Sequence, residues 1–159
     1  MTLQGDDPMA LDPIVVRDAQ DSDAEAVVRL IQELAEHEGW PSPITPETVV
    51  KYLATPGNGL ILAQCGDDIC GLLSYSIQAN LYHAAAIGHI DELVVSGERR
   101  GQGVGSALMT ELMDRLRHLG CAEVSVTVMP ENLHAQKFYR AHGLVEEVIS
   151  LEKHFEEKP

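Results

Sequence analysis

The sequence predicts an α/β (α+β) fold in which a mixed sheet carries helices on both faces. Apolar runs of strand length alternate with longer segments whose apolar residues recur at helical spacing. A glycine-rich turn joins one of these strands directly to a helix. The expected order is a strand, two helices, three strands, a helix, a strand, a helix and a strand. With 159 residues and 45% apolar content, the chain can bury one substantial core.

The first half of the chain is expected to form one strand, two helices and a hairpin. Proline is favoured at the first position of a helix, which places a helix start at Pro46. The spacing of two apolar runs around residues 66–68 predicts the hairpin. The expected elements are a strand at 14–17, a helix capped by Asp21, Ser22 or Asp23 and ended by Gly39, a helix from Thr45-Pro46-Glu47 to about Ala54, and strands at 60–65 and 69–76.

The second half is expected to form the remaining five elements. These are a strand at about 87–95, a helix at 103–119, a strand at 124–128, a helix at 133–142 and a last strand at 144–151. One face of the helix at 103–119 carries Val104, Leu108, Leu112, Leu116 and Leu119. We expect residues 1–13 to be a disordered leader, residues 14–151 a single domain and residues 152–159 a charged tail.

The most informative stretch is the basic, glycine-rich turn Arg99-Arg100-Gly101-Gln102-Gly103-Val104-Gly105-Ser106. Its glycines permit a tight turn and a close backbone approach to a ligand. The first N–H groups of the helix that follows suit a phosphate. A mononucleotide P-loop would need a lysine, which the turn lacks, and the dinucleotide fingerprint would need a third glycine at Ser106. The turn therefore predicts a polyphosphate site of neither kind.

A second motif lies downstream, Asn132-Leu133-His134-Ala135-Gln136-Lys137-Phe138-Tyr139-Arg140-Ala141-His142-Gly143-Leu144. It is similar to the N-x-x-A-x-x-F/L-Y-x-x-x-G-F segment of the GNAT superfamily of N-acetyltransferases, with Leu144 where phenylalanine is commoner. Residues 100–105 resemble the acetyl-CoA pyrophosphate loop of the same family, Q/R-x-x-G-x-G/A. The resemblance extends from about Ile14 to about Leu151.

This resemblance implies the GNAT fold, with a mixed, mostly antiparallel sheet of six to seven strands, and acetyl-CoA as co-substrate. It implies that the strands near 90–95 and 124–128 splay apart, so that the pantetheine arm enters between them. The cofactor-binding residues it implies are Leu93, Val94 and Val95 through their backbone, Arg100, Gly101, Gln102, Gly103, Val104, Gly105 and Ser106 in the loop, and Asn132 and Phe138. Asn132 is also placed to cap a helix.

Transfer of an acetyl group from a thioester to an amine needs an acid for the departing thiolate. By the same resemblance, this general acid is Tyr139. A phenol, with an ordinary pKa of about 10, can usefully donate a proton to a thiolate. The alternative is a tyrosine packed in the core with its hydroxyl bonded elsewhere.

The amine must also lose a proton, and its pKa near 10.4 calls for a carboxylate or an imidazole. The strand before the loop offers His89, Asp91 and Glu92. Strand alternation places His89 and Asp91 on one face and Glu92 on the other, with Ile90 and Val94, unless a bulge intervenes. We favour Asp91 and Glu92 as a pair. The alternative is that these carboxylates only attract the acceptor.

The acceptor is expected to be a small cationic amine. Residues 1–98 hold sixteen acids against three basic residues, whereas residues 99–140 hold six basic residues against four acids. The acidic half would attract a cation, although the acids can equally serve solubility alone. Relatives line the acceptor pocket at the end of the first helix, where this chain has Glu33, His37 and Trp40. Carboxylates beside an indole suit a cationic amine; a solvated helix end is the alternative.

Several other classes of partner are not expected. A net charge of −14 argues against nucleic acid. No apolar run has the length of a membrane span. The seven histidines lack the spacing of zinc ligands, so we expect no metal. Cysteines 65, 70 and 121 form no metal or redox motif, and we expect three reduced thiols in a cytoplasmic protein.

The sequence thus predicts an acetyl-CoA-dependent N-acetyltransferase acting on a primary amine, with small-molecule acceptors favoured over proteins. Two alternatives stay open: an acyl-CoA-binding sensor or regulatory module without turnover, and a transferase that uses a longer acyl-CoA. The family often dimerises through its C-terminal strands, so a homodimer through residues 144–151 is conceivable. Those residues lack a clean alternation of apolar side chains, and the oligomeric state is left open.

Overall fold

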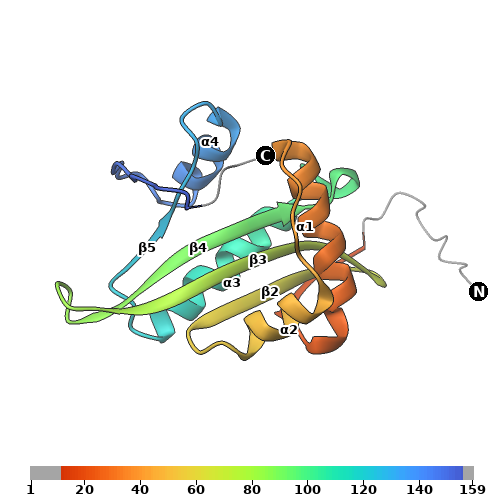
Figure 1. Cartoon of the computed structure of the whole chain (residues 1–159), viewed down its shortest axis with the longest axis horizontal. Coiled ribbons are helices and arrows are strands. Elements are labelled where there is room, and N and C mark those ends of the chain that lie inside the picture. Colours follow the sequence, from red (N-terminus) through yellow and green to blue (C-terminus); the bar gives the residue numbers. More distant parts are fainter. Residues whose placement is uncertain (1–11, 156–159) are drawn as a thin grey trace, which may run out of the picture.

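The centre of the molecule is a five-stranded sheet with the strand order β1-β2-β3-β4-β5 (Figure 1). The computed structural model describes residues 12–155. The first four strands pair antiparallel, and β4 and β5 pair parallel. The mixed sheet is as expected, but it has five strands rather than six or seven. The strands are β1 (Ile14–Asp18), β2 (Asn58–Cys65), β3 (Asp68–Asn80), β4 (Ala85–Val95) and β5 (Glu123–Val126).

Helices cover both faces of this sheet, as expected. One core cluster joins the sheet to α3, and a second joins its other face to α1 and α2 (Figure 1). The helix α4 follows β5 beyond the sheet. The helices are α1 (Ala24–Glu38), α2 (Pro46–Ala54), α3 (Val104–His118) and α4 (Leu133–Ala141). Within residues 12–155, no helix has the length and apolar content needed to cross a bilayer.

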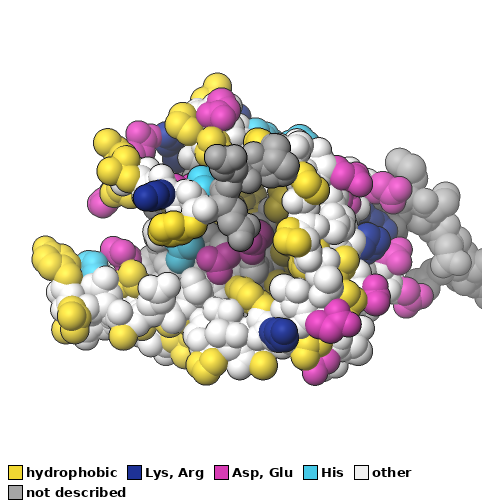
Figure 2. All heavy atoms as spheres, viewed as in Figure 1, with side chains coloured by type: hydrophobic (Ala, Val, Ile, Leu, Met, Phe, Trp, Pro, Cys, Tyr) yellow, Lys and Arg dark blue, Asp and Glu magenta, His cyan; other side chains and the backbone are white. Residues whose placement is uncertain are grey.

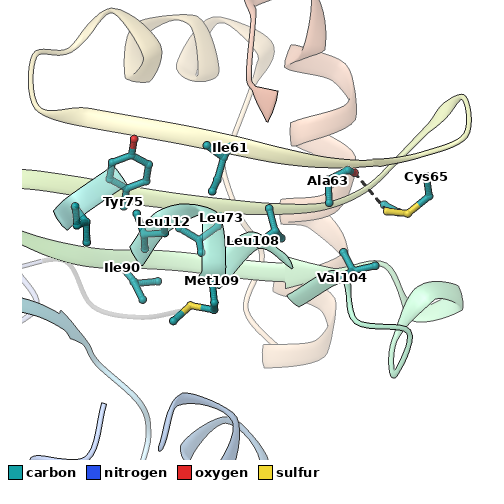
Figure 3. Packing of buried hydrophobic residues seen from close by; sticks show 12 residues of the cluster. Ile61, Ala63, Cys65, Leu73, Tyr75, Ile90, Val104, Leu108, Met109 and Leu112 are labelled. Carbon is teal, nitrogen blue, oxygen red and sulfur yellow. Dashed lines mark hydrogen bonds between the residues drawn. A yellow bond between two sulfur atoms is a disulfide. The ribbon is translucent and has the colours of Figure 1, made fainter. Parts of the chain in front are cut away.

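The apolar face of α3 forms much of the core, with one correction at its end. Val104, Leu108, Leu112 and Leu116 are buried as expected, and Met109 joins them (Figure 3). Leu119 is 60% exposed, because it caps the helix at its C-terminus and extends past the edge of the sheet contact.

The strands β3 and β4 form a long hairpin that contains a β-bulge. Ser74 pairs with Glu92, whereas the next residue, Tyr75, pairs with Ile90. Asp91 therefore has no partner on β3, and the side-chain alternation of β4 reverses at this point. Ile90 belongs to the cluster on the α3 face, while Val94 belongs to the cluster on the α1–α2 face.

The strands β4 and β5 pair over only part of their length. The register runs from Ile87 with Glu123 to Ile90 with Val126. Beyond these pairs β4 continues to Val95, while β5 ends and the chain departs towards α4 (Figure 1). This divergence is the splay that the family resemblance implied.

The expected last strand at 144–151 is wrong. The described part of this segment has no regular secondary structure. Its side chains Val145, Val148, Ile149 and Leu151 are all more than 60% exposed. Their irregular spacing gives neither face of a strand a continuous apolar surface, so no register is favoured. Of the expected leader at 1–13 and the expected tail at 152–159, residues 1–11 and 156–159 lie outside the described residues.

The expectation of three reduced thiols is also wrong. Cys65 and Cys70 form a disulfide within the β2–β3 hairpin, and Cys121 is free (Figure 3). The hairpin brings the two Cα atoms to 6.0 Å, within the range that a disulfide spans. The cysteine count missed this because it considered motifs rather than strand pairing. The thiols therefore give no support to a cytoplasmic location.

We expect Leu112→Ala to lower the free energy of unfolding by about 2–5 kcal/mol, because the side chain is fully buried and its removal leaves a cavity. The matched control, Leu119→Ala in the cap of the same helix, should change it by less than about 0.5 kcal/mol. Chemical denaturation measures both. Equal losses in the two variants would contradict this placement of α3 on the sheet.

Candidate active site

The glycine-rich turn between β4 and α3 is open and rich in free backbone donors. Gly101 and Gly103 have φ angles of 73° and 85°, a region that favours glycine. No atom lies within 4 Å of a Cβ built on either residue. Gly103 caps α3 without a side-chain hydrogen bond, and the first helical bond runs from Ala107 to Gly103. The N–H groups of residues 104–106 are therefore left for an anion, which fits a pyrophosphate.

Two polar side chains of the turn hydrogen-bond to backbone carbonyls of the same segment and stabilise its conformation. Arg100 donates from Nε to the Val95 carbonyl at 3.3 Å, and Gln102 donates to the Glu98 carbonyl at 3.1 Å. Arg99 pairs with Asp12 at 3.5 Å. Arg100 is exposed and keeps its charge at the mouth of the turn, as a contact for phosphate requires.

Glu33 makes a hydrogen bond that connects α1 to the segment after β4. Its Oε1 accepts a hydrogen bond of 2.7 Å from the Gly97 N–H, which ties α1 to the start of the glycine-rich turn. His37 and Trp40 are exposed near the end of α1. A role for these three side chains in acceptor binding stays a prediction.

The backbone of Leu93, Val94 and Val95 follows the last pair between β4 and β5. On the β5 side, their polar groups have no neighbouring strand in the described sheet. A pantetheine arm has amides that can pair with such a strand edge. The splay thus places the expected cofactor-binding backbone beside the turn that would hold the pyrophosphate.

The helix α4 packs against the start of α3 through Phe138. The Asn132 side chain accepts a hydrogen bond of 3.1 Å from the Ala135 N–H. Asn132 therefore caps the N-terminus of α4, as its sequence position indicated. A Cβ on Gly105 would lie 3.2 Å from the Phe138 ring, which shows how closely the two helices approach. Phe138 thus packs beneath the turn, and cofactor contacts for it and Asn132 remain proposals.

Tyr139 is half-buried next to Phe138, with its ring centroid 5.3 Å away in an edge-on arrangement. Burial raises the pKa of the Tyr139 phenol to about 12. The phenol therefore keeps its proton throughout the neutral range. Among the described residues, none forms a hydrogen bond with its hydroxyl, so the alternative of a hydroxyl bonded elsewhere is not observed.

The bulge at Asp91 corrects the expected placement of the acidic pair. Glu92 does not share a face with Ile90, because the bulge reverses the alternation between them. Ile90 points towards α3, whereas Glu92 lines a cavity on the α1–α2 side. Asp91 also meets that side, through a hydrogen bond of 3.2 Å from the Tyr52 hydroxyl of α2. Both carboxylates therefore lie on the α1–α2 side of the sheet.

Glu92 is held by Ser74, its cross-strand partner. The Ser74 hydroxyl accepts a hydrogen bond of 2.9 Å from the Glu92 N–H and donates to Glu92 Oε2. Burial raises the pKa of the Glu92 carboxyl, and the neighbouring Asp91 raises it further. The hydrogen bond from Ser74 and the nearby His89 oppose this rise. A carboxylate with a raised pKa is a stronger base than an exposed one.

Two further groups surround the acidic pair. The Tyr52 hydroxyl also lies 3.1 Å from the Tyr75 carbonyl oxygen. Burial raises the pKa of the Tyr52 phenol well above its ordinary value. His89 Nδ1 lies 2.9 Å from Ser125 Oγ, across the last stretch where β4 and β5 pair. The sequence reading missed Ser74 and Tyr52. Only the register of the β3–β4 hairpin could have indicated Ser74.

The cavity beside Glu92 has a volume of about 320 Å³ and lies between the sheet, α1, α2 and the segment that joins these two helices. Figure 2 shows acidic side chains in the hollowed centre of this face. Neither Glu33, His37 nor Trp40 is among its lining residues. The polar side chains that line it are Ser42, Thr48, Tyr52, Ser74 and Glu92.

Comparison with known proteins finds curated relatives that are N-acetyltransferases. A curated relative, the aminoalkylphosphonate N-acetyltransferase of Salmonella typhimurium, is 30% identical over 128 residues, which cover 80% of this chain and 82% of that protein. The thialysine N-epsilon-acetyltransferase of Bos taurus is 25% identical over 147 residues, which cover 82% of this chain and 83% of that protein.

Solved structures share the fold. A transcriptional regulator from Bacillus halodurans C-125 superposes with a TM-score of 0.80 at 24% identity, covering 90% of this chain and all of that one. An aminoglycoside acetyltransferase from an uncultured soil metagenomic sample, in complex with sisomicin, superposes with a TM-score of 0.78 at 20% identity. The match covers 91% of this chain and 97% of that one. The model of the acetyltransferase (GNAT) family matches residues 25–144. The chain therefore belongs to the acetyltransferase (GNAT) family and is an acyltransferase.

Proposed function

We propose that the chain transfers the acetyl group of acetyl-CoA to a primary amine by direct attack on the thioester. The observation that carries this proposal is the half-buried carboxyl of Glu92, which faces a cavity at the point where β4 and β5 diverge. The proposal is tested by measuring CoA thiol release from acetyl-CoA with a panel of primary amines. Binding of acetyl-CoA without release for any amine would favour a regulatory module instead.

The glycine-rich turn would hold the pyrophosphate through the N–H groups of residues 104–106, with the charge of Arg100 at its mouth. The strand edge at residues 93–95 would align the pantetheine arm. When bound, acetyl-CoA supplies a thioester carbonyl that an amine can attack. In the proposed mechanism, Glu92 on β4 would act on the amine and Tyr139 on α4 on the sulfur of that group.

The acceptor must reach the thioester as a neutral amine. The Glu92 carboxylate accepts one proton from the ammonium group, and its raised pKa favours this transfer. Asp91, exposed and held by Tyr52, adds negative charge that attracts the ammonium form. Glu92 is thus the base of the proposed mechanism, and Asp91 assists it.

The departing thiolate takes up a proton as the bond between carbon and sulfur breaks. Tyr139 is the donor in the proposed mechanism, because burial keeps its phenol protonated and its hydroxyl is not engaged by another described residue. The attacking nitrogen loses its second proton to solvent as the amide forms. After CoA leaves, Glu92 releases its proton to solvent and Tyr139 takes one up, so that one proton is released in each turnover.

We expect Glu92→Gln to lower kcat by roughly 10²- to 10⁴-fold, because the amide cannot accept the proton of the ammonium. The wild-type rate should rise with pH through the raised pKa of Glu92, since only the ionised form is active. The substitution Glu92→Gln also removes the half-buried charge of the carboxylate, whose raised pKa shows that ionisation is unfavourable in the folded state. The free energy of unfolding of this variant at pH 8 should therefore not fall below that of the wild type. Steady-state kinetics and chemical denaturation measure these effects. A larger loss of kcat in Asp91→Asn would assign the base to Asp91.

We expect Tyr139→Phe to lower kcat at least about 100-fold while the Kd for acetyl-CoA is unchanged, because the ring and its packing on Phe138 remain. Calorimetric titration and CoA release measure the two quantities. The control is Tyr82→Phe at the exposed tip of the β3–β4 hairpin, which should alter neither. Unchanged turnover in Tyr139→Phe would refute the acid role.

We expect Gly103→Leu to weaken acetyl-CoA binding at least about tenfold, because the side chain would enter the open space of the turn. The matched control is Gly120→Leu, at the other end of α3. Its φ of 71° and empty surroundings are similar, so the backbone strain of about 1–2 kcal/mol is shared. Equal Kd values in the two variants would contradict the assignment of the turn.

A further inference from the structure

The cavity beside Glu92 is apolar over most of its wall. Seven of its twelve lining residues are aliphatic or proline, among them Val27, Ile31, Ile44, Val49, Leu60 and Leu72. Four of these belong to the buried cluster that joins α1 and α2 to the sheet. The cavity is therefore an opening in the core of this face, and the aliphatic part of its wall cannot hydrogen-bond to a polar ligand.

The polar side chains of the wall are largely engaged with the protein. The Ser42 hydroxyl accepts from the Ile44 N–H, and Thr48 pairs with Thr45 through both its N–H and its hydroxyl. Ser74 is committed to Glu92. Only the Glu92 carboxylate brings a full charge to the cavity, and it does so at one end of the wall, on β4.

We infer that the acceptor is a primary amine carried on an apolar body, such as an arylalkylamine or alkylamine, with the body in this cavity and the nitrogen at Glu92. This inference rests on the proposed acetyl transfer and specifies its substrate class. The ammonium finds its counter-charge at Glu92, and the apolar body gains the free energy of leaving water.

The same wall disfavours the polar acceptors that the names of the relatives indicate. A phosphonate or phosphate group needs cationic or N–H donors, and no lysine or arginine is among the lining residues. A polyamine or aminoglycoside would place further ammonium or hydroxyl groups against aliphatic side chains. Binding would then be weakened, because burying a polar group without a hydrogen-bond partner costs free energy. The charge and the apolar wall together select a single cationic head on an apolar body.

The test measures kcat/KM for CoA release with purified protein, acetyl-CoA and four amines: 2-phenylethylamine, ethylamine, spermidine and 2-aminoethylphosphonate. We expect 2-phenylethylamine to exceed each of the other three by at least about tenfold. A preference for spermidine or the phosphonate would overturn the inference and leave acetyl transfer standing. Bound acetyl-CoA with no release for any amine would overturn the proposed function, and the inference with it.

A pair of neighbouring substitutions on α2 tests the location of the apolar body. Val49 is buried in the wall, whereas Val50 is 37% exposed and does not line the cavity. In Val49→Ala, the ratio of kcat/KM for 2-phenylethylamine to that for ethylamine should fall about threefold or more, while Val50→Ala should keep the wild-type ratio. Because both amines are measured on one preparation, a loss of folded protein cancels in the ratio. An unchanged ratio in Val49→Ala would overturn the placement of the body in this cavity.

Discussion

The active face of this protein depends on one extra residue in β4. Without the bulge at Asp91, alternation would place Glu92 on the same side as Ile90, under α3 and away from the cavity. With it, Ile90 fills the α3 side of the core, and both carboxylates reach the α1–α2 side. A bulge costs one unpaired residue in the ladder, and here that residue is Asp91, whose carboxylate takes a hydrogen bond from Tyr52.

The divergence of β4 and β5 follows from the connection between them. Parallel neighbours need a crossover, and α3 supplies it by packing on the face opposite α1 and α2. The turn that starts this crossover must leave β4 and enter a helix at once, which requires left-handed backbone at Gly101 and Gly103. The same sharp turn exposes the first N–H groups of α3 at the mouth of the splay. Topology thus brings these N–H groups, the proposed phosphate donors, and the open strand edge together.

Much of this could be predicted from the sequence, because the signals were local. The helix periodicity of residues 104–116 and the glycines of the turn each lie within one element. The errors arose where the outcome depends on the register of one strand against the next. Ser74 meets Glu92, and Cys65 meets Cys70, only once the hairpin registers are known. Residues 144–151 have strand-like composition, but composition does not fix strand pairing, and in the described chain they pair with no strand.

The proposed preference for an apolar acceptor and the raised pKa of Glu92 have one physical cause, the aliphatic surroundings of the cavity. Burial among the aliphatic side chains of the α1–α2 face raises the pKa of Glu92, with Asp91 adding to the effect. The aliphatic wall that would favour an apolar acceptor belongs to the same surroundings. A more polar wall, suited to a sugar or a phosphonate, would solvate the carboxylate and lower its pKa towards the ordinary value. Such a carboxylate would accept the ammonium proton less readily. If this cavity holds the acceptor as we infer, polar groups added to it to broaden the acceptor range would weaken Glu92 as the proposed base.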